Sequence, residues 1–425
     1  MYKTHTHLFL LKNNMNSVEK LFINPTNKNQ KLARTAKKKF KVLQAVYLLD
    51  RASVNELMLS LDLSFPTLNT LIVDLLDQKL ITQHERGESI GGRKPNLYQL
   101  KNELFRVLCI EMDRFNSSLS FIDNNGNLLA RTLRYPLMLS RDVSSLPAFI
   151  DIIRQYVADQ GIEWSQVTGL SISMPGLINK DTGENYTFFH AANFNLQTHL
   201  AETFNKTTCI TNSVNIASIA EMHYGLLKNR EEGLVVLIDW GVSVGIISDG
   251  KVFQGKHGFA GEMGHISFVE DGELCYCGKR GCLETVASGT ALVKRAKNDI
   301  ANGTPTLITN MFNDQDLRPI DILKAAVDGD QYAIELISDV SAHLGKAIAQ
   351  FLQVLNPECI VLSGSFASAA SLITNPIQQQ IQTYTMGKIS KDCELYVSEL
   401  SDRGAILGLS RFFIEKYFAD KLKLA

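Results

Sequence analysis

Four side chains in one short segment have the types and spacing of a metal site. They form the pattern H-x9-C-x-C-x4-C and are His265, Cys275, Cys277 and Cys282. Thiolates and a neutral imidazole are the ligands that tetrahedral zinc prefers, and four protein ligands leave no open position for an activated water. The pattern therefore predicts one structural zinc per chain. The alternative is three free thiols that stand near a histidine by chance.

The remaining cysteines and the composition place the chain among ordinary globular proteins of a reducing compartment. The other four cysteines are scattered, and seven is an odd number, which argues against a complete disulfide framework. A hydrophobic fraction of 45% and a charged fraction of 20% over 425 residues exclude a disordered, collagenous or coiled-coil chain. No apolar run approaches the roughly 20 residues of a membrane span. We therefore expect a cytoplasmic protein with no membrane partner.

Charge is distributed unevenly along the chain. Residues 1–103 contain 16 Lys+Arg and 9 Asp+Glu, whereas the remaining 322 residues contain 27 and 35. A basic front on an acidic body indicates a polyanionic partner for the front, such as double-stranded DNA. Residues 1–35 are polar with little periodicity, so we expect a flexible basic arm there. A solvated basic segment without a partner is the alternative.

Residues 36–102 have the pattern of a winged helix-turn-helix. Apolar residues recur at helical spacing from Phe40 to Leu49, Ser53 is placed to cap a second helix, and Ser64 is placed to cap a third. Two strand-like runs, Leu80–His84 and Asn96–Leu100, flank a Gly-Gly-Arg-Lys-Pro turn. Three short helices followed by a hairpin match this DNA-binding layout, although protein-binding modules share the three-helix pattern.

The second helix of a helix-turn-helix presents its N-terminal residues to the major groove. This predicts DNA contacts from side chains that can hydrogen-bond to bases or phosphates, with cationic residues at the wing tip entering a narrow A·T-rich minor groove. The predicted DNA-binding residues are Ser64, Thr67, Asn69, Thr70, Arg93 and Lys94.

From residue 103 onward the pattern is α/β. Strand-like apolar runs alternate with helical runs, and two strand–glycine turn–strand stretches, around Gly126 and Gly250, suggest two similar lobes. The predicted strands are 105–112, 119–122, 167–174, 234–239, 244–247 and 359–362. The predicted helices are 146–158, 214–227, 331–356 and 405–417.

The predicted metal ligands belong to two sequence motifs, Gly-Glu-Met-Gly-His at 261–265 and Cys-Tyr-Cys-Gly-Lys-Arg-Gly-Cys-Leu-Glu at 275–284. The two motifs resemble the signature of the ROK family, which groups sugar kinases with sugar-responsive repressors. Segments 174–176, 239–245 and 404–408 also match, so the resemblance covers about residues 104–420. The front end resembles that of the repressor branch, to which xylose and N-acetylglucosamine repressors belong.

The resemblance implies an actin-like (ribonuclease H-like) two-lobed body. Lobe one would hold residues 103–230 and the C-terminal helix 404–425, and lobe two residues 231–403. It further implies a homodimer or homotetramer and a sugar or sugar phosphate in the cleft. The side chains that it places on the sugar are Asn212, Glu262, His265 and Glu284, with His265 using the ring nitrogen that does not hold zinc.

Two departures from the kinase pattern decide between the branches. Kinase members follow the asparagine with an aspartate that acts as general base, and here Ser213 stands in that place. A serine without an adjacent base cannot accept the sugar proton near neutral pH. The first phosphate loop of the kinases has two glycines, and Asp113 and Arg114 stand in this stretch instead. The sequence therefore predicts a sugar-responsive transcriptional regulator, a repressor of carbohydrate-metabolism genes and not an enzyme; the alternative is an ATP-dependent sugar kinase.

Overall fold

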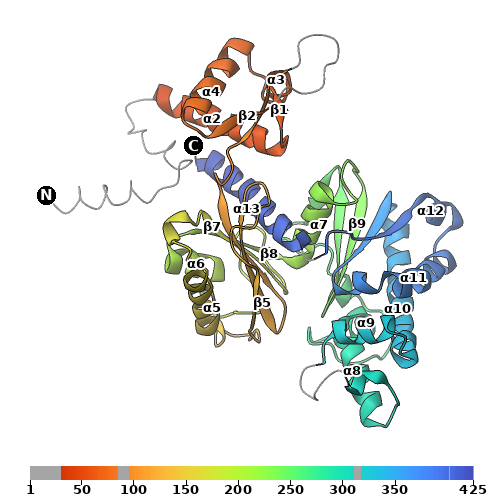
Figure 1. Cartoon of the computed structure of the whole chain (residues 1–425). Coiled ribbons are helices and arrows are strands. Elements are labelled where there is room, and N and C mark those ends of the chain that lie inside the picture. Colours follow the sequence, from red (N-terminus) through yellow and green to blue (C-terminus); the bar gives the residue numbers. More distant parts are fainter. Residues whose placement is uncertain (1–29, 85–94, 311–316, 402, 425) are drawn as a thin grey trace.

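The computed structural model describes residues 30–84, 95–310, 317–401 and 403–424, in which three β-sheets follow one another along the chain with helices packed against them (Figure 1). A three-stranded sheet lies near the N-terminus, and two five-stranded sheets follow it. The chain is therefore mixed α/β, as the alternation of apolar and helical runs predicted.

We call the N-terminal part, residues 30–84 and 95–100, the head. Its helices are α2 (Gln30–Leu48), α3 (Val54–Leu61) and α4 (Phe65–Asp77), and its antiparallel sheet has the order β1-β3-β2, with β1 (Ala52–Ser53), β2 (Ile81–His84) and β3 (Leu97–Leu100). Helix α2 begins inside the stretch that was predicted as an arm. The rest of that arm and the turn with Arg93 and Lys94 lie outside the described residues.

The two central helices of the head, α3 and α4, begin at the two serines that the sequence placed as caps. The predicted cap at Ser53 is confirmed, because its hydroxyl accepts a hydrogen bond from the Glu56 N–H (3.3 Å) while the Glu56 carboxylate accepts one from the Ser53 N–H (2.7 Å). Ser64 occupies the N-cap position of α4 but its hydroxyl makes no capping bond. Helices α3 and α4 are bent by 115° relative to one another.

The first five-stranded sheet has the order β6-β5-β4-β7-β8. Its strands are β4 (Arg106–Met112), β5 (Asn116–Asp123), β6 (Leu133–Pro136), β7 (Gly169–Met174) and β8 (Thr207–Asn212). Side chains alternate between the two faces of a strand. Leu108 and Ile110 of β4 therefore face helices α5 (Leu146–Asp159) and α6 (Leu196–Phe204), whereas Val107 and Cys109 face helix α13 (Arg403–Leu424).

The second five-stranded sheet repeats this arrangement in the order β11-β10-β9-β12-β13. In each sheet two antiparallel pairings are followed by two parallel ones. Its strands are β9 (Gly233–Ile238), β10 (Val242–Ser248), β11 (Lys251–Phe253), β12 (Cys359–Ser363) and β13 (Glu394–Val397). The repeat agrees with the two strand–glycine turn–strand stretches in the sequence.

Helices cover both faces of the second sheet. Helix α7 (Ser213–Tyr224) contacts one face, and the other is covered by α8 (Gly289–Ala301), α9 (Pro319–Val327), α10 (Gln331–Leu355), α11 (Ala370–Tyr384) and α12 (Gly387–Asp392). Five short 3₁₀ turns complete the described elements: Trp164–Gln166, Met263–His265, Leu283–Thr285, Leu307–Asn310 and Ser365–Ala369.

The head and the first five-stranded sheet share one hydrophobic core. Phe40 of α2 packs edge-on against Phe418 of α13, with ring centroids 5.1 Å apart, and Phe105 contacts the same ring at 5.4 Å. In Figure 1 the head accordingly lies against the end of α13. No single helix in the described part of the chain is long and apolar enough to span a membrane; α3 and α4 reach that length and composition only as a pair, which is bent.

Candidate metal centre and effector site

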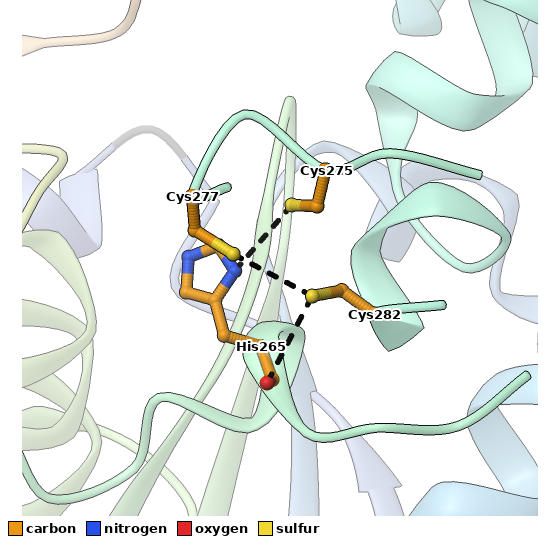
Figure 2. A group of neighbouring side chains, drawn as sticks. All are labelled: His265, Cys275, Cys277 and Cys282. Carbon is orange, nitrogen blue, oxygen red and sulfur yellow. Dashed lines mark hydrogen bonds between the residues drawn. The ribbon is translucent and has the colours of Figure 1, made fainter. Parts of the chain in front are cut away.

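The predicted metal ligands lie together. His265 ends a 3₁₀ turn after β11, and the three cysteines come from the loop that follows, which returns through an isolated β-bridge between Ser267 and Cys282. Figure 2 shows the four side chains pointing toward one another. Their nearest donor atoms, His265 Nδ1 and the three sulfurs, all lie within 4.8 Å of one another.

The spacing of these atoms fits zinc. Cys277 Sγ lies 3.6 Å from Cys282 Sγ, and Cys275 Sγ lies 3.7 Å from His265 Nδ1. Tetrahedral ligands at zinc–sulfur distances of about 2.3 Å are separated by about 3.8 Å. A positive φ of +69° and a Cβ that would lie 1.8 Å from the Val269 carbonyl oxygen require glycine at position 281. The tight return of the loop toward the metal site therefore depends on Gly281.

The second ring nitrogen of His265 is hydrogen-bonded to a residue that the sequence prediction missed. Its Nε2 lies 3.1 Å from the hydroxyl of Tyr276, and the two rings meet edge-on at 5.2 Å. The sequence prediction assigned this nitrogen to sugar. Tyr276 stands between two of the predicted metal ligands in the Cys-Tyr-Cys motif, so its position beside the histidine was available from the spacing.

Asn212 and Glu262 meet at the edges of the two sheets. Asn212 ends β8 and caps α7, because its Oδ1 accepts a hydrogen bond from the Val214 N–H at 3.0 Å. Its Nδ2 donates to the Gly176 carbonyl oxygen at 3.1 Å and reaches Glu262 Oε1 at 3.5 Å. Three segments far apart in the sequence are thereby joined at one point.

Glu284 is buried and Glu262 is half-buried, and the two carboxyl groups interact electrostatically. Burial raises the pKa of Glu262 to about 7, and the charge of Glu284 adds to this effect. Burial also raises the pKa of Glu284 to about 7, against a hydrogen bond from the Val242 N–H and the positive charge of Arg114. Because both pKa values are raised, a proton is held here more readily than on a free carboxyl group, and a protonated carboxyl group can both donate and accept hydrogen bonds, as sugar hydroxyl groups require.

We call the parts of the body built on the first and on the second five-stranded sheet its first and second halves. The turn between β4 and β5 belongs to the first half and contacts the second. The Phe115 ring packs on the Trp240 ring at a centroid distance of 4.4 Å, and the Arg114 guanidinium lies 5.5 Å from the centre of the Tyr276 ring. Asp113 closes this turn by accepting hydrogen bonds from the N–H groups of Phe115 (2.6 Å) and Asn116 (2.8 Å).

A second arginine of the first half also reaches the metal loop. Arg141 donates from Nη2 to the Tyr276 carbonyl oxygen at 2.7 Å. The two residues are separated by 135 positions, and no motif in the sequence indicated that they meet. Tyr276 is thus held from the first half of the body at both its backbone and its ring.

The predicted DNA-contacting residues of α4 lie at its N-terminal end. Ser64, Asn69 and Thr70 are exposed and Thr67 is half-buried. The hydroxyl groups of Ser64 and Thr67 are hydrogen-bonded to one another at 3.0 Å. The Thr70 hydroxyl group donates a hydrogen bond to the Pro66 carbonyl oxygen at 2.9 Å.

Comparison with known proteins identifies the family. The model of the ROK family matches residues 107–416. The chain belongs to the ROK family. The ROK relatives include the DNA-binding transcriptional dual regulator NagC of Escherichia coli K12, which is 29% identical over 334 residues, covering 78% of this chain and 81% of NagC. They also include a glucokinase of Halalkalibacterium halodurans, 32% identical over 251 residues, which cover 57% of this chain and 75% of that enzyme.

A solved structure supports the same assignment over almost the whole chain. The crystal structure of a ROK family transcriptional regulator, described as a homologue of the E. coli MLC protein, superposes with a TM-score of 0.72 at 25% identity. The match covers 92% of this chain and 100% of that one. Residues 107–416, which the family model matches, make up less than 92% of the chain, so the structural match must extend beyond them into the head.

Proposed function

We propose that this ROK protein is a sugar-responsive, DNA-binding transcriptional regulator, a repressor of carbohydrate-metabolism genes that a sugar or sugar phosphate releases or modulates. The observation that carries the proposal is the head. Two helices joined by a short turn and bent by 115° are followed by an antiparallel hairpin, the layout of a winged helix-turn-helix. The extent of the match to the ROK regulator supports this interpretation of the head.

In this proposal α4 enters the major groove. Its N-terminal end carries the exposed side chains Ser64, Asn69 and Thr70, and asparagine can bond bidentately to adenine. Arg93 and Lys94, which lie outside the described residues in the segment between β2 and β3, would contact phosphate or the minor groove. A homodimer or homotetramer would place two heads on two half-sites, since operator symmetry mirrors protein symmetry.

The effector site in this proposal is the cluster around the metal loop. His265, Cys275, Cys277 and Cys282 would hold a structural zinc, and Asn212, Glu262, Glu284 and the Nε2 of His265 would contact sugar hydroxyl groups. The support is the convergence of Asn212 from β8 with Glu262, and the electrostatic interaction of Glu262 with Glu284, at one partly buried, polar place. A zinc held by these four side chains would fix the backbone of the loop and thereby preorganise the groups that meet the sugar.

Phosphoryl transfer is the competing function, and two features weigh against it. Ser213 stands beside Asn212 where a kinase needs a general base. The turn between β4 and β5 packs onto the turn after β9 through Phe115 and Trp240, at 4.4 Å. Phosphate-binding loops bring backbone N–H groups close to the phosphates, and bulky rings at this turn do not favour such an approach.

Three measurements test the proposal. Genomic fragments pulled down with the full-length protein should share an operator, and a thermal-shift screen of sugars and sugar phosphates should give at least one hit. On that operator, Asn69→Ala should weaken specific binding about 5- to 100-fold, whereas Gln78→Ala at the far end of α4 should not. Sugar phosphate formed from ATP, magnesium and sugar by the unaltered protein, or an absence of operator enrichment, would overturn the proposal.

A further inference from the structure

The hydroxyl group of Tyr276 occupies a position that the proposed function reserves for the effector. It lies 3.1 Å from His265 Nε2, while the Nδ1 of the same ring lies 3.7 Å from Cys275 Sγ and faces the metal centre. The tyrosine comes from the metal loop itself, between Cys275 and Cys277. The protein therefore carries its own hydroxyl group at the only ring nitrogen of His265 that a sugar can reach.

The chemistry of the imidazole sets the direction of this hydrogen bond. A neutral histidine that ligates zinc through Nδ1 keeps its proton on Nε2. The Nε2–H group then donates, and the Tyr276 oxygen accepts. A sugar hydroxyl oxygen is also an acceptor, so one hydroxyl group can replace the other without leaving the histidine donor unpaired.

Tyr276 also connects this place to the opposite half of the body. Its carbonyl oxygen accepts a hydrogen bond from Arg141 at 2.7 Å, and its ring lies under the Arg114 guanidinium at 5.5 Å. Both arginines belong to the half built on the first five-stranded sheet. A change in the position of the Tyr276 ring therefore changes a contact between the two halves, while the backbone bond to Arg141 is independent of the hydroxyl group.

We propose that Tyr276 is a built-in occupant of the sugar subsite at His265, which the effector displaces. In this arrangement a sugar hydroxyl group takes the histidine hydrogen bond, and the tyrosine ring turns away from His265 against Arg114. The displaced ring converts occupancy of the subsite into an altered contact between the two halves. The inference rests on the proposed sugar-binding function and deepens it by naming the residue that competes with the ligand.

The test compares Tyr276→Phe with the parent protein and with Tyr384→Phe, a matched change at an exposed tyrosine of α11. Full-length, zinc-loaded proteins are titrated calorimetrically with glucose, xylose, N-acetylglucosamine and the 6-phosphates of glucose and N-acetylglucosamine. Removing the competing hydroxyl group should tighten binding of the responding sugar about 2- to 12-fold, the range of one net hydrogen bond. Tyr384→Phe should bind like the parent.

A second readout follows His265 without relying on affinity. In the unliganded parent, the ¹⁵N signal of His265 Nε2 should shift on Tyr276→Phe, and it should shift again in the parent when sugar binds. Equal or weaker sugar binding by Tyr276→Phe at full zinc content, or an unchanged Nε2 signal in that variant, would overturn the inference while leaving sugar binding intact. If none of the five probes binds the parent, the proposed sugar response and this inference are overturned together.

Discussion

The guanidinium group of Arg411 lies over the ring of Tyr47, 4.5 Å from its centre, and its Nη1 donates to the Tyr47 carbonyl oxygen at 3.4 Å. Arg411 belongs to α13 of the body and Tyr47 to α2 of the head. The arginine is only 6% exposed and also pairs with Glu415. A buried cation thus joins the head to the body beside the hydrophobic core that they share.

The same helix connects this joint to the effector site. Helix α13 packs along α7, and α7 begins at the residue after Asn212. His223 of α7 lies 3.6 Å from Glu415 of α13. The candidate sugar site and the head therefore contact opposite ends of one packed pair of helices. A displacement at one end can be transmitted through these packed side chains to the other end.

Replacing Arg411 by alanine should loosen the joint between head and body. The change removes the contact with the Tyr47 ring, one of the two hydrogen bonds to the Tyr47 carbonyl oxygen and the arginine that pairs with Glu415, at a cost of about 1–3 kcal/mol. We expect faster amide hydrogen exchange in α2 and a melting temperature lower by several degrees. Arg403→Ala, at the exposed start of the same helix, is the control; exchange in α2 that is equally slow in both variants would contradict the prediction.

His223 should make stability depend on pH. Burial lowers the pKa of His223, and the positive charges of Arg411 and Lys228 add to this, against the opposing charge of Glu415. The folded protein then binds the proton less readily than the unfolded chain. The free energy of unfolding should therefore fall as the pH drops below about 6.5, the ordinary histidine value.

Histidine 223 can be separated from other sources of acid sensitivity by substitution. In His223→Gln the loss of stability between pH 7.5 and 5.5, followed by urea unfolding, should be smaller than in the parent. His257→Gln, at an exposed position, should retain the full loss. A parental pH profile in His223→Gln would show that this histidine is not responsible.

The sequence predicted the elements whose signals are local. The cap at Ser53, the start of α10 at Gln331 and the cluster of four metal ligands were all readable, because each depends on spacing within one segment. The strands β6, β8 and β13 were not predicted. Strands β6 and β13 have no fully buried side chain, and β8 has only two adjacent apolar residues, so all three lack the apolar run that identifies a central strand.

The parts of the candidate site that depend on distant contacts could not be predicted. Arg141 and Arg411 meet their partners 135 and 364 positions away, and neither belongs to a motif. The shared core of Phe40, Phe105 and Phe418 is equally long-range. A single sequence indicates which side chains are apolar, but the topology decides which of them pack together.

Gly408 should be required for the close packing of α13 on α7. A Cβ atom at this position would lie 2.5 Å from the Ile216 carbonyl oxygen. Alanine favours helices over glycine by about 1 kcal/mol, so without this contact Gly408→Ala would stabilise the protein. We expect the opposite sign, a loss of about 1–3 kcal/mol from overpacking, measured by thermal unfolding.

A matched control isolates the contact. Gly387, at the start of α12, has open space around its Cβ position, so Gly387→Ala should leave stability close to the parental value or raise it slightly. A melting temperature of Gly408→Ala at or above that of the parent would contradict the prediction. It would mean that α13 and α7 move apart to accommodate the added Cβ atom without a loss of stability.

Removal of one metal ligand should abolish zinc binding and weaken sugar binding together. Cys277 is exposed, so Cys277→Ser removes a thiolate while disturbing little packing. We expect metal analysis to give about one zinc per chain in the parent and almost none in the variant, together with a lower melting temperature. Cys393→Ser, at a half-buried cysteine outside the cluster, should retain the metal. Chelation of zinc from the parent should reproduce the properties of the variant, because both treatments remove the restraint that positions His265 and Glu284. A Cys277→Ser protein with full zinc content and parental sugar affinity would show that the cluster neither holds the zinc nor supports sugar binding.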